Sequence, residues 1–118
     1  MNRSRLILIA FVAFACILLA GCPKQVTVAE IQADPGRFSG KEVAIRGNVS
    51  NSFGALGQGA YELDDGTGRI WILVEQGGVP SKGARVRSQG QIVGGVSFAG
   101  RNFATALRES SHKVESDR

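Results

Sequence analysis

The sequence is poor in the residues that most often carry out chemistry. Its 118 residues include two cysteines, Cys16 and Cys22, and one histidine, His112, which stands in a polar C-terminal segment. A Cys–His nucleophile pair therefore has few candidates, and a haem carrier of the kind that uses a domain histidine has none. We expect a protein that is not an enzyme and that needs no cofactor and no metal.

Acidic pairs and phosphate-binding loops are also missing. Asp64 and Asp65 are adjacent, so on a strand their carboxylates would face opposite sides and could not share a substrate. The run "DDGTG" lacks the spacing and the final glutamate of an EF-hand, and "GALGQG" lacks the Lys-Ser/Thr of a P-loop. We interpret "DDGTGR" as a hairpin turn in which Asp65 and Thr67 hydrogen-bond to nearby backbone.

Charge of one sign does not dominate the chain. Its formal net charge is +4, from 14 basic and 10 acidic residues. Arg3 and Arg5 lie at the very start, so the chain after residue 21 has 12 basic and 10 acidic residues, a net charge of +2. Such a small excess does not by itself imply nucleic-acid affinity, and any basic signal must come from clustering.

One apolar run stands out near the N-terminus. Residues 6–20 contain no charge, but fifteen residues fall short of the roughly 20 that a helix needs to span a bilayer. A basic start, an apolar run and small residues after it are typical of a secretory signal peptide. A short transmembrane anchor is the alternative.

The end of this run is more specific, because Leu19-Ala20-Gly21-Cys22 resembles the lipobox of bacterial lipoproteins. The resemblance implies a signal peptide at 1–21, cleavage before Cys22, lipidation of Cys22 and a lipidated tether at 22–26. Two or more acyl chains anchor a protein stably to a membrane. Pro23, where an aspartate would favour inner-membrane retention, favours the periplasmic face of the outer membrane if the cell is Gram-negative.

The rest of the chain has the period-two alternation of β-strands and no long helical pattern. We predict five strands, over residues 41–51, 60–64, 69–76, 84–93 and 102–108. The third is apolar on both faces, which indicates a central, covered strand. Gly47 and Gly90 lie inside strands and suit the sharp coiling of a small closed barrel. Phe103, Thr105 and Leu107 are predicted to share one face of the last strand.

The segments between and beside the strands are expected to be short. Thr27 and Glu30 form a capping box before one short helix, under which Val28, Ile31 and Phe38 would pack. The glycine-rich segments 50–59 and 94–101 are interpreted as loops. Residues 110–118 are polar and are expected to form a frayed tail.

Residues 27–107 resemble a small bacterial OB-fold domain in the stretches "GKEVAIRGNV", "YELDDGTGRIWI" and "KGARVRSQGQIVGG". The resemblance implies an all-β, five-stranded Greek-key barrel over residues 27–109, with one short N-terminal helix. Many OB-folds place a helix between strands three and four. The run "EQGGVPSKG" is too short and too rich in Gly and Pro for one, so the N-terminal helix would cover that barrel end.

OB-folds bind oligonucleotides or oligosaccharides on strands two and three and the flanking loops. The corresponding candidate ligand-binding residues here are Trp71, Arg69, Phe53, Phe98, Arg46, Arg85 and Arg87. Aromatic rings stack bases or sugars, and arginines beside them hold phosphates or carboxylates. The alternative is that Trp71 packs against a helix or a loop, that the two phenylalanines plug the barrel ends or fold over Trp71, and that the arginines form a solvated face.

Together these features predict a lipid-anchored, non-catalytic binding module of the cell envelope. Its partners would be the membrane, through Cys22, and an oligomeric ligand such as a glycan, a peptide or an anionic polymer. Binding of single-stranded nucleic acid is one alternative, against which the exported address and the small net charge count. A structural role, in which the sheet or its edge docks another envelope protein, is another.

Overall fold

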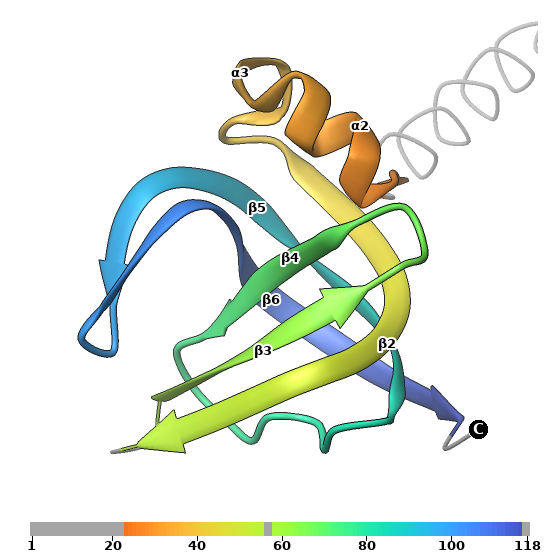
Figure 1. Cartoon of the computed structure of the whole chain (residues 1–118), viewed down its shortest axis with the longest axis vertical. Coiled ribbons are helices and arrows are strands. Elements are labelled where there is room, and N and C mark those ends of the chain that lie inside the picture. The colour runs from red at the N-terminus through yellow and green to blue at the C-terminus, as the bar shows by residue number, and fades with distance from the viewer. Residues whose placement is uncertain (1–22, 56–57, 117–118) are drawn as a thin grey trace, which may run out of the picture.

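The strands of the computed structural model, which describes residues 23–55 and 58–116, wrap into a closed barrel (Figure 1). The elements are β1 (Lys24–Gln25), β2 (Glu42–Ala55), β3 (Gln58–Asp64), β4 (Arg69–Val74), β5 (Arg85–Phe98) and β6 (Arg101–Ser116). Their order is β1-β2-β3-β4-β6-β5, and β5 pairs back onto β2, which closes the barrel. The ladders β1–β2 and β4–β6 are parallel and the others antiparallel. This order confirms the predicted all-β Greek-key barrel of OB-fold type.

Two short helices precede the barrel and lie at one end of it (Figure 1). The helix α2 (Val28–Ala33) begins at Thr27, whose Oγ1 accepts a hydrogen bond from the N–H of Glu30 at 3.2 Å. A turn, α3 (Pro35–Phe38), follows directly. Val28, Ile31 and Phe38 are buried in the barrel core, as predicted. A six-residue helix is not stable alone, so this packing and capping must hold it.

The β3–β4 turn also caps this helix, which the sequence did not reveal. Asp65 Oδ2 accepts a hydrogen bond from the N–H of Val28 at 2.8 Å, and Thr67 Oγ1 accepts one from the N–H of Ala29 at 3.0 Å. Asp65 Oδ1 accepts further bonds from Thr67 and Gly68, as expected for this turn. Burial raises the pKa of the Asp65 carboxyl, but these hydrogen bonds outweigh it and hold that pKa below its usual value.

The helix therefore covers a different barrel end from the one expected. It lies over the β3–β4 turn, whereas the β4–β5 connection runs along the opposite end in Figure 1. That connection closes its own end, because Pro80 is buried and Val79 packs against the barrel core. It is fixed to β2 by a bond from the N–H of Gly83 to the carbonyl of Val49 at 2.8 Å.

Two glycines allow the strands to coil tightly. A Cβ atom on Gly47 would collide with the backbone oxygen of Asp64, and one on Gly90 would collide with that of Arg108. Both positions were expected to be points of sharp coiling. The close backbone approach explains why no larger side chain fits there.

Both glycine-rich segments predicted to be loops are instead arms of long hairpins (Figure 1). The strand β2 continues to Ala55 and β3 begins at Gln58, while β5 continues to Phe98 and β6 begins at Arg101. Glycine does not prevent ladder pairing, and Gly54 pairs directly with Gly59. Among the described residues of these segments, only the tip residues Ala99 and Gly100, with φ +50° and +79°, and the bend at Gly95, with φ +59°, need left-handed backbone.

The two ends of the domain are also more ordered than expected. The last strand was predicted to stop near Arg108 before a frayed tail, but β6 runs on to Ser116 and pairs with β5. At the N-terminal end β1 pairs with β2, and Val26 is buried, so part of the expected tether lies in the sheet. The ladder carries Glu109 opposite Gly90 and Ser111 opposite Gln89, which leaves Ser110 as a bulged residue.

Candidate functional site

A second apolar cluster lies outside the barrel, on the outer face of β3 and β4. Alternation along these strands sends Tyr61 and Ile72 into the barrel and Ala60, Trp71 and Leu73 outward. The arms of both long hairpins pack over this outer face. We call it the outer cluster; it consists of Ala60, Leu73, Phe98, Phe103 and Ala106, which are buried, and Phe53, Trp71, Val93 and Val96, which are partly exposed.

Three rings of the outer cluster surround one arginine. The ring centroids of Phe53 and Trp71 are 5.7 Å apart with an interplanar angle of 61°, and those of Trp71 and Phe103 are 5.9 Å apart at 57°. The Cζ atom of Arg101 lies 5.0 Å from the Phe53 and Trp71 centroids and 5.9 Å from that of Phe103. These distances are those of cation–π contacts. We call these four residues the aromatic surface.

The aromatic surface borders a cavity of about 340 Å³. Trp71, Arg101 and Phe103 form one side, and Gln32 and Pro35 of the helical segment form another. Among the described residues that line it, Arg101 is the one charged side chain. A guanidinium that rests on rings keeps its N–H groups free at the edges, so it can bind an anion while a planar group stacks beside it.

The structure brings the three predicted aromatic residues together but gives them different positions. Phe53 and Trp71 are partly exposed, whereas Phe98 is 8 % exposed and packs inside the outer cluster. Phe103 is as deeply buried but lines the cavity, whereas Phe98 lines none of the cavities described here, so the alternative in which Phe98 folds into the packing around Trp71 describes it better.

Sequence reasoning missed Arg101 and the position of Phe103. Phe103 was expected to share a face with Leu107, but Leu107 lies in the barrel core and Phe103 in the outer cluster. In the β5–β6 ladder Gly94 pairs with Thr105 and Val96 with Phe103, but Gly95 and Ala104 between them are not paired. The hairpin bends at this point, where Gly95 has left-handed backbone. Arg101 directly follows the hairpin tip. It could have been found from the sequence, because it is the charged residue next to Gly100 in a segment that was expected to flank the binding site.

Arg69 lies on the same strand as Trp71 but is paired with acidic residues. Its Nε is 3.2 Å from Asp64 Oδ2, and its Nη1 is 3.9 Å from Glu62 Oε1. Its side chain is 62 % exposed, so these contacts are worth little in stability. They nevertheless cancel its charge locally, which makes Arg69 a weaker anion ligand than Arg101.

The other three predicted arginines lie on a different wall, along the β2–β5 ladder. Residues 42–48 of β2 pair with β5 and residues 48–55 pair with β3, so Arg46, Arg85 and Arg87 fall on the half far from Trp71. Arg46 Nε is 2.6 Å from Glu115 Oε1, and Arg87 Nη1 donates to Gln89 Oε1 at 3.1 Å. These three arginines therefore do not lie among the residues around Trp71, and their part in ligand binding stays a prediction.

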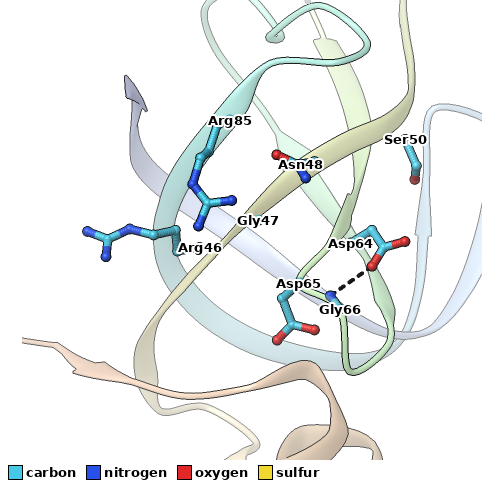
Figure 2. A pocket seen from close by; sticks show the side chains of 8 residues that line it. All are labelled: Arg46, Gly47, Asn48, Ser50, Asp64, Asp65, Gly66 and Arg85. Atoms are coloured by element: carbon cyan, nitrogen blue, oxygen red, sulfur yellow. Dashed lines mark hydrogen bonds between the residues drawn. The ribbon is translucent and has the colours of Figure 1, made fainter. Parts of the chain in front are cut away.

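Arg46 and Arg85 instead border a polar pocket of about 310 Å³ (Figure 2). The figure shows the two arginines on one side and the carboxylates of Asp64 and Asp65 on the other. Asp64 already accepts a hydrogen bond from Gly66 at 2.9 Å and Asp65 caps α2, so the acidic side is occupied by local bonds. The pocket has no aromatic lining among the described residues.

A buried polar network holds β6 against β3 and β5. The side chain of Glu109 is 5 % exposed; it accepts hydrogen bonds from Tyr61 Oη and from Ser88 Oγ, the latter at 2.9 Å, and lies 2.8 Å from His112 Nδ1. The expectation that His112 belongs to a frayed tail is wrong, because the bulge at Ser110 turns it to the same side as Glu109. Burial and the charge of Glu109 raise the pKa of Tyr61 far above its usual value.

This network lines none of the cavities described above. Across residues 23–55 and 58–116, no group of three or more His, Cys, Asp or Glu side chains is arranged to hold a metal ion. In the same part of the chain, no helix has the length and apolarity needed to cross a bilayer. The lipobox residues Leu19–Cys22 lie outside the described residues.

No protein-family model matches the chain, and no curated protein matches it in sequence. Solved structures do resemble it. Asparaginyl-tRNA synthetase from Pyrococcus horikoshii has a TM-score of 0.60 at 16 % identity, over 79 % of this chain and 23 % of that one. A putative aspartyl-tRNA synthetase from Leishmania major Friedlin has a TM-score of 0.61 at 14 % identity, over 80 % and 21 %.

A replication protein A heterotrimer bound to single-stranded DNA is also similar, with a TM-score of 0.50 at 20 % identity. The match covers 64 % of this chain and 57 % of that one. The chain thus spans less than a quarter of each synthetase and somewhat more than half of the replication protein A chain. At these identities the likeness concerns the fold, and the fold is that of OB domains.

Proposed function

We propose that this chain is a non-catalytic module that binds single-stranded nucleic acid on the aromatic surface. One observation carries the proposal: the Arg101 guanidinium rests among the rings of Phe53, Trp71 and Phe103. It lies beside a cavity whose described lining residues include no acidic side chain. Stacking on aromatic rings together with arginine contacts to phosphate is the usual way in which OB-folds hold single strands. The replication protein A structure supports the proposal with the same fold.

Titration with a single-stranded oligonucleotide tests this function, because Trp71 is the one tryptophan of the chain. We expect its fluorescence to change in the full chain in non-ionic detergent, and the affinity to fall as salt is raised. A neutral oligosaccharide of similar length serves as the comparison ligand. Binding of the oligosaccharide without any response to the oligonucleotide would contradict the proposal.

A second candidate is binding of an envelope oligomer, such as a glycan or a peptide. The lipobox sequence Leu19-Ala20-Gly21-Cys22 favours it, because lipidation at Cys22 would place the domain outside the cytoplasm, at the periplasmic face of the outer membrane in a Gram-negative cell. The substitution Cys22→Ser should abolish acylation and processing at this position. A lipidated Cys22→Ser product would refute the anchor.

A further inference from the structure

A second, smaller cavity continues the one at the aromatic surface. Its volume is about 160 Å³, and it shares Pro35, Ala104 and Thr105 with the larger cavity. The two cavities therefore form one groove, with the helical segment on one bank and the β6 arm on the other. Gly36 and Ser39 line only the smaller cavity, at the end away from Trp71.

Both banks of the groove are fixed before any ligand arrives. The helical bank is tied to β5 by bonds from the N–H of Gly40 to the carbonyl of Ile92 at 2.8 Å and from the N–H of Ile92 to the carbonyl of Lys41 at 3.2 Å. The other bank is held by the β5–β6 ladder, in which Gly94 pairs with Thr105. A groove between two anchored elements demands little ordering on binding, which favours affinity.

The lining of the smaller cavity suits one flat, uncharged ring. Its described lining residues carry no charge; the hydroxyls of Ser39 and Thr105 offer hydrogen bonds, and Ile92 and Val93 offer apolar contact. Gly36 leaves open space, because a Cβ atom there would meet nothing within 4 Å. Pockets for drug-sized ligands measure roughly 300–1,000 Å³, so this cavity has room for a fragment the size of a single ring system.

We propose that the smaller cavity is a base-binding subsite, which receives the nucleotide next to the one stacked at Arg101 and Trp71. This inference rests on the proposed function. The shared residues Ala104 and Thr105 place the two subsites side by side, as consecutive bases of an extended strand require. The strand then runs along the groove between α3 and β6, and the phosphate between the two bases lies on the side of Arg101, the one cation of the described lining.

Filling the smaller cavity from the helical bank tests the subsite. The full chain in non-ionic detergent is titrated with an oligonucleotide and with the same oligonucleotide carrying one abasic position, moved along the strand. Gly36→Leu and Ser39→Phe are the filling variants. Gly78→Leu and Ser81→Phe, on the exposed β4–β5 connection, are their matched controls.

We expect each filling variant to bind about tenfold more weakly than the wild type, since one stacked base is worth roughly that factor. The controls should bind like the wild type. One abasic position should weaken the wild type to the same extent, and it should not weaken the filling variants further. The Trp71 fluorescence response should persist in all of them, because the first base still stacks there.

Equal affinity of wild type and filling variants for the oligonucleotide would overturn the subsite and leave the proposed function standing. An oligonucleotide that binds none of these proteins would overturn both. If an extended uncharged peptide binds and loses its affinity in Gly36→Leu while oligonucleotide binding is unchanged, the groove is a peptide site and the base subsite is wrong.

Discussion

The barrel core and the outer cluster are built from the same strands, but from different kinds of side chain. Inside the barrel the contacts are mainly between aliphatic residues of five strands and α2, with Tyr61 and Phe38 as the aromatic members. Outside it, four aromatic rings gather over β3 and β4, two of them partly exposed and three of them in contact with Arg101.

On a single strand, residues that stabilise the barrel core therefore alternate with residues that face the candidate binding surface. Ile72 is completely buried and its neighbour Trp71 faces the groove, so one strand serves both regions through alternate residues. Aromatic residues and arginine are enriched at binding hot spots, whereas aliphatic residues fill cores. Substitutions in the two regions should therefore act on different measured quantities.

The largest effect on folding is expected in the barrel core. Ile72→Ala removes a fully buried side chain and should lower the free energy of unfolding by about 3 kcal/mol, in the range of large-to-small core substitutions. Phe53→Ala, in the partly exposed rim of the outer cluster, should lower it by about 1 kcal/mol. Urea unfolding measures both, and equal losses would mean that the outer cluster is a second core.

Tyr61 should make stability fall at high pH. Its pKa is raised in the folded state, so above the unfolded-state value of about 10 the unfolded chain releases a proton that the folded chain keeps. Tyr61→Phe should cost about 1–2 kcal/mol at neutral pH through the lost bond to Glu109. The gap between wild type and variant should shrink above pH about 10; a gap that does not change between neutral and alkaline pH would contradict this.

Asp65 should make a moderate contribution to the free energy of unfolding, because it caps the helix that covers the barrel core. Asp65→Ala removes the cap on Val28 and should lower the free energy of unfolding by about 1 kcal/mol. Because the pKa of Asp65 is lowered on folding, its contribution is present above the unfolded value of about 3.9 and is lost as the pH falls below it. Thermal melts at a series of acidic pH values measure this. If the melting temperature of Asp65→Ala falls with decreasing pH as steeply as that of the wild type, the prediction is wrong.

The smallest effects on stability, and the clearest on binding, should come from exposed arginines. Arg101→Gln should lower the free energy of unfolding by about 0.5–1 kcal/mol, the value of an exposed cation–π contact, and should reduce the salt dependence of oligonucleotide binding by about one phosphate contact. Arg85→Gln, on the β2–β5 wall, is the matched control and should leave binding unchanged. If both variants lose affinity equally, the binding site does not lie at the outer cluster.

The sequence predicted those parts of the fold that depend on local pattern. Alternation from Val43 to Val49 identified a barrel strand, and Thr27 with Glu30 identified the helix start. Glycine content misled the assignment of residues 50–59 and 94–101, because glycines such as Gly54 signal loops by propensity although the ladder accepts them. Their ladder partners are close in the sequence, since Gly54 pairs with Gly59 and Phe98 with Arg101, so the glycine content, and not the distance between partners, masked these hairpins.

The candidate surface was predicted in part. Trp71 and Phe53 could be placed from the general OB-fold pattern, since both lie where strands two and three and their flanking segment meet. Arg101 and Phe103 could not, because they reach Trp71 only after the arm bends at Gly95. Arg46, Arg85 and Arg87 were favoured by their charge and by their outward position in the strand alternation, and neither shows which half of the β2 strand an arginine lies beside.

Ser110 shows that in the last strand the length of the chain matters as much as its composition. The bulge there adds one position to the count, and it decides which of the following residues point inward. If Ser110 paired with Gln89 without a bulge, every residue type would be kept, yet Lys113 would lie opposite Val86 and face the interior, while His112 would lie opposite Arg87 and face water. Relatives of this domain that lose one residue at this bulge should therefore keep the inward side of His112, whereas those that lose one elsewhere between Glu109 and His112 without losing the bulge should not.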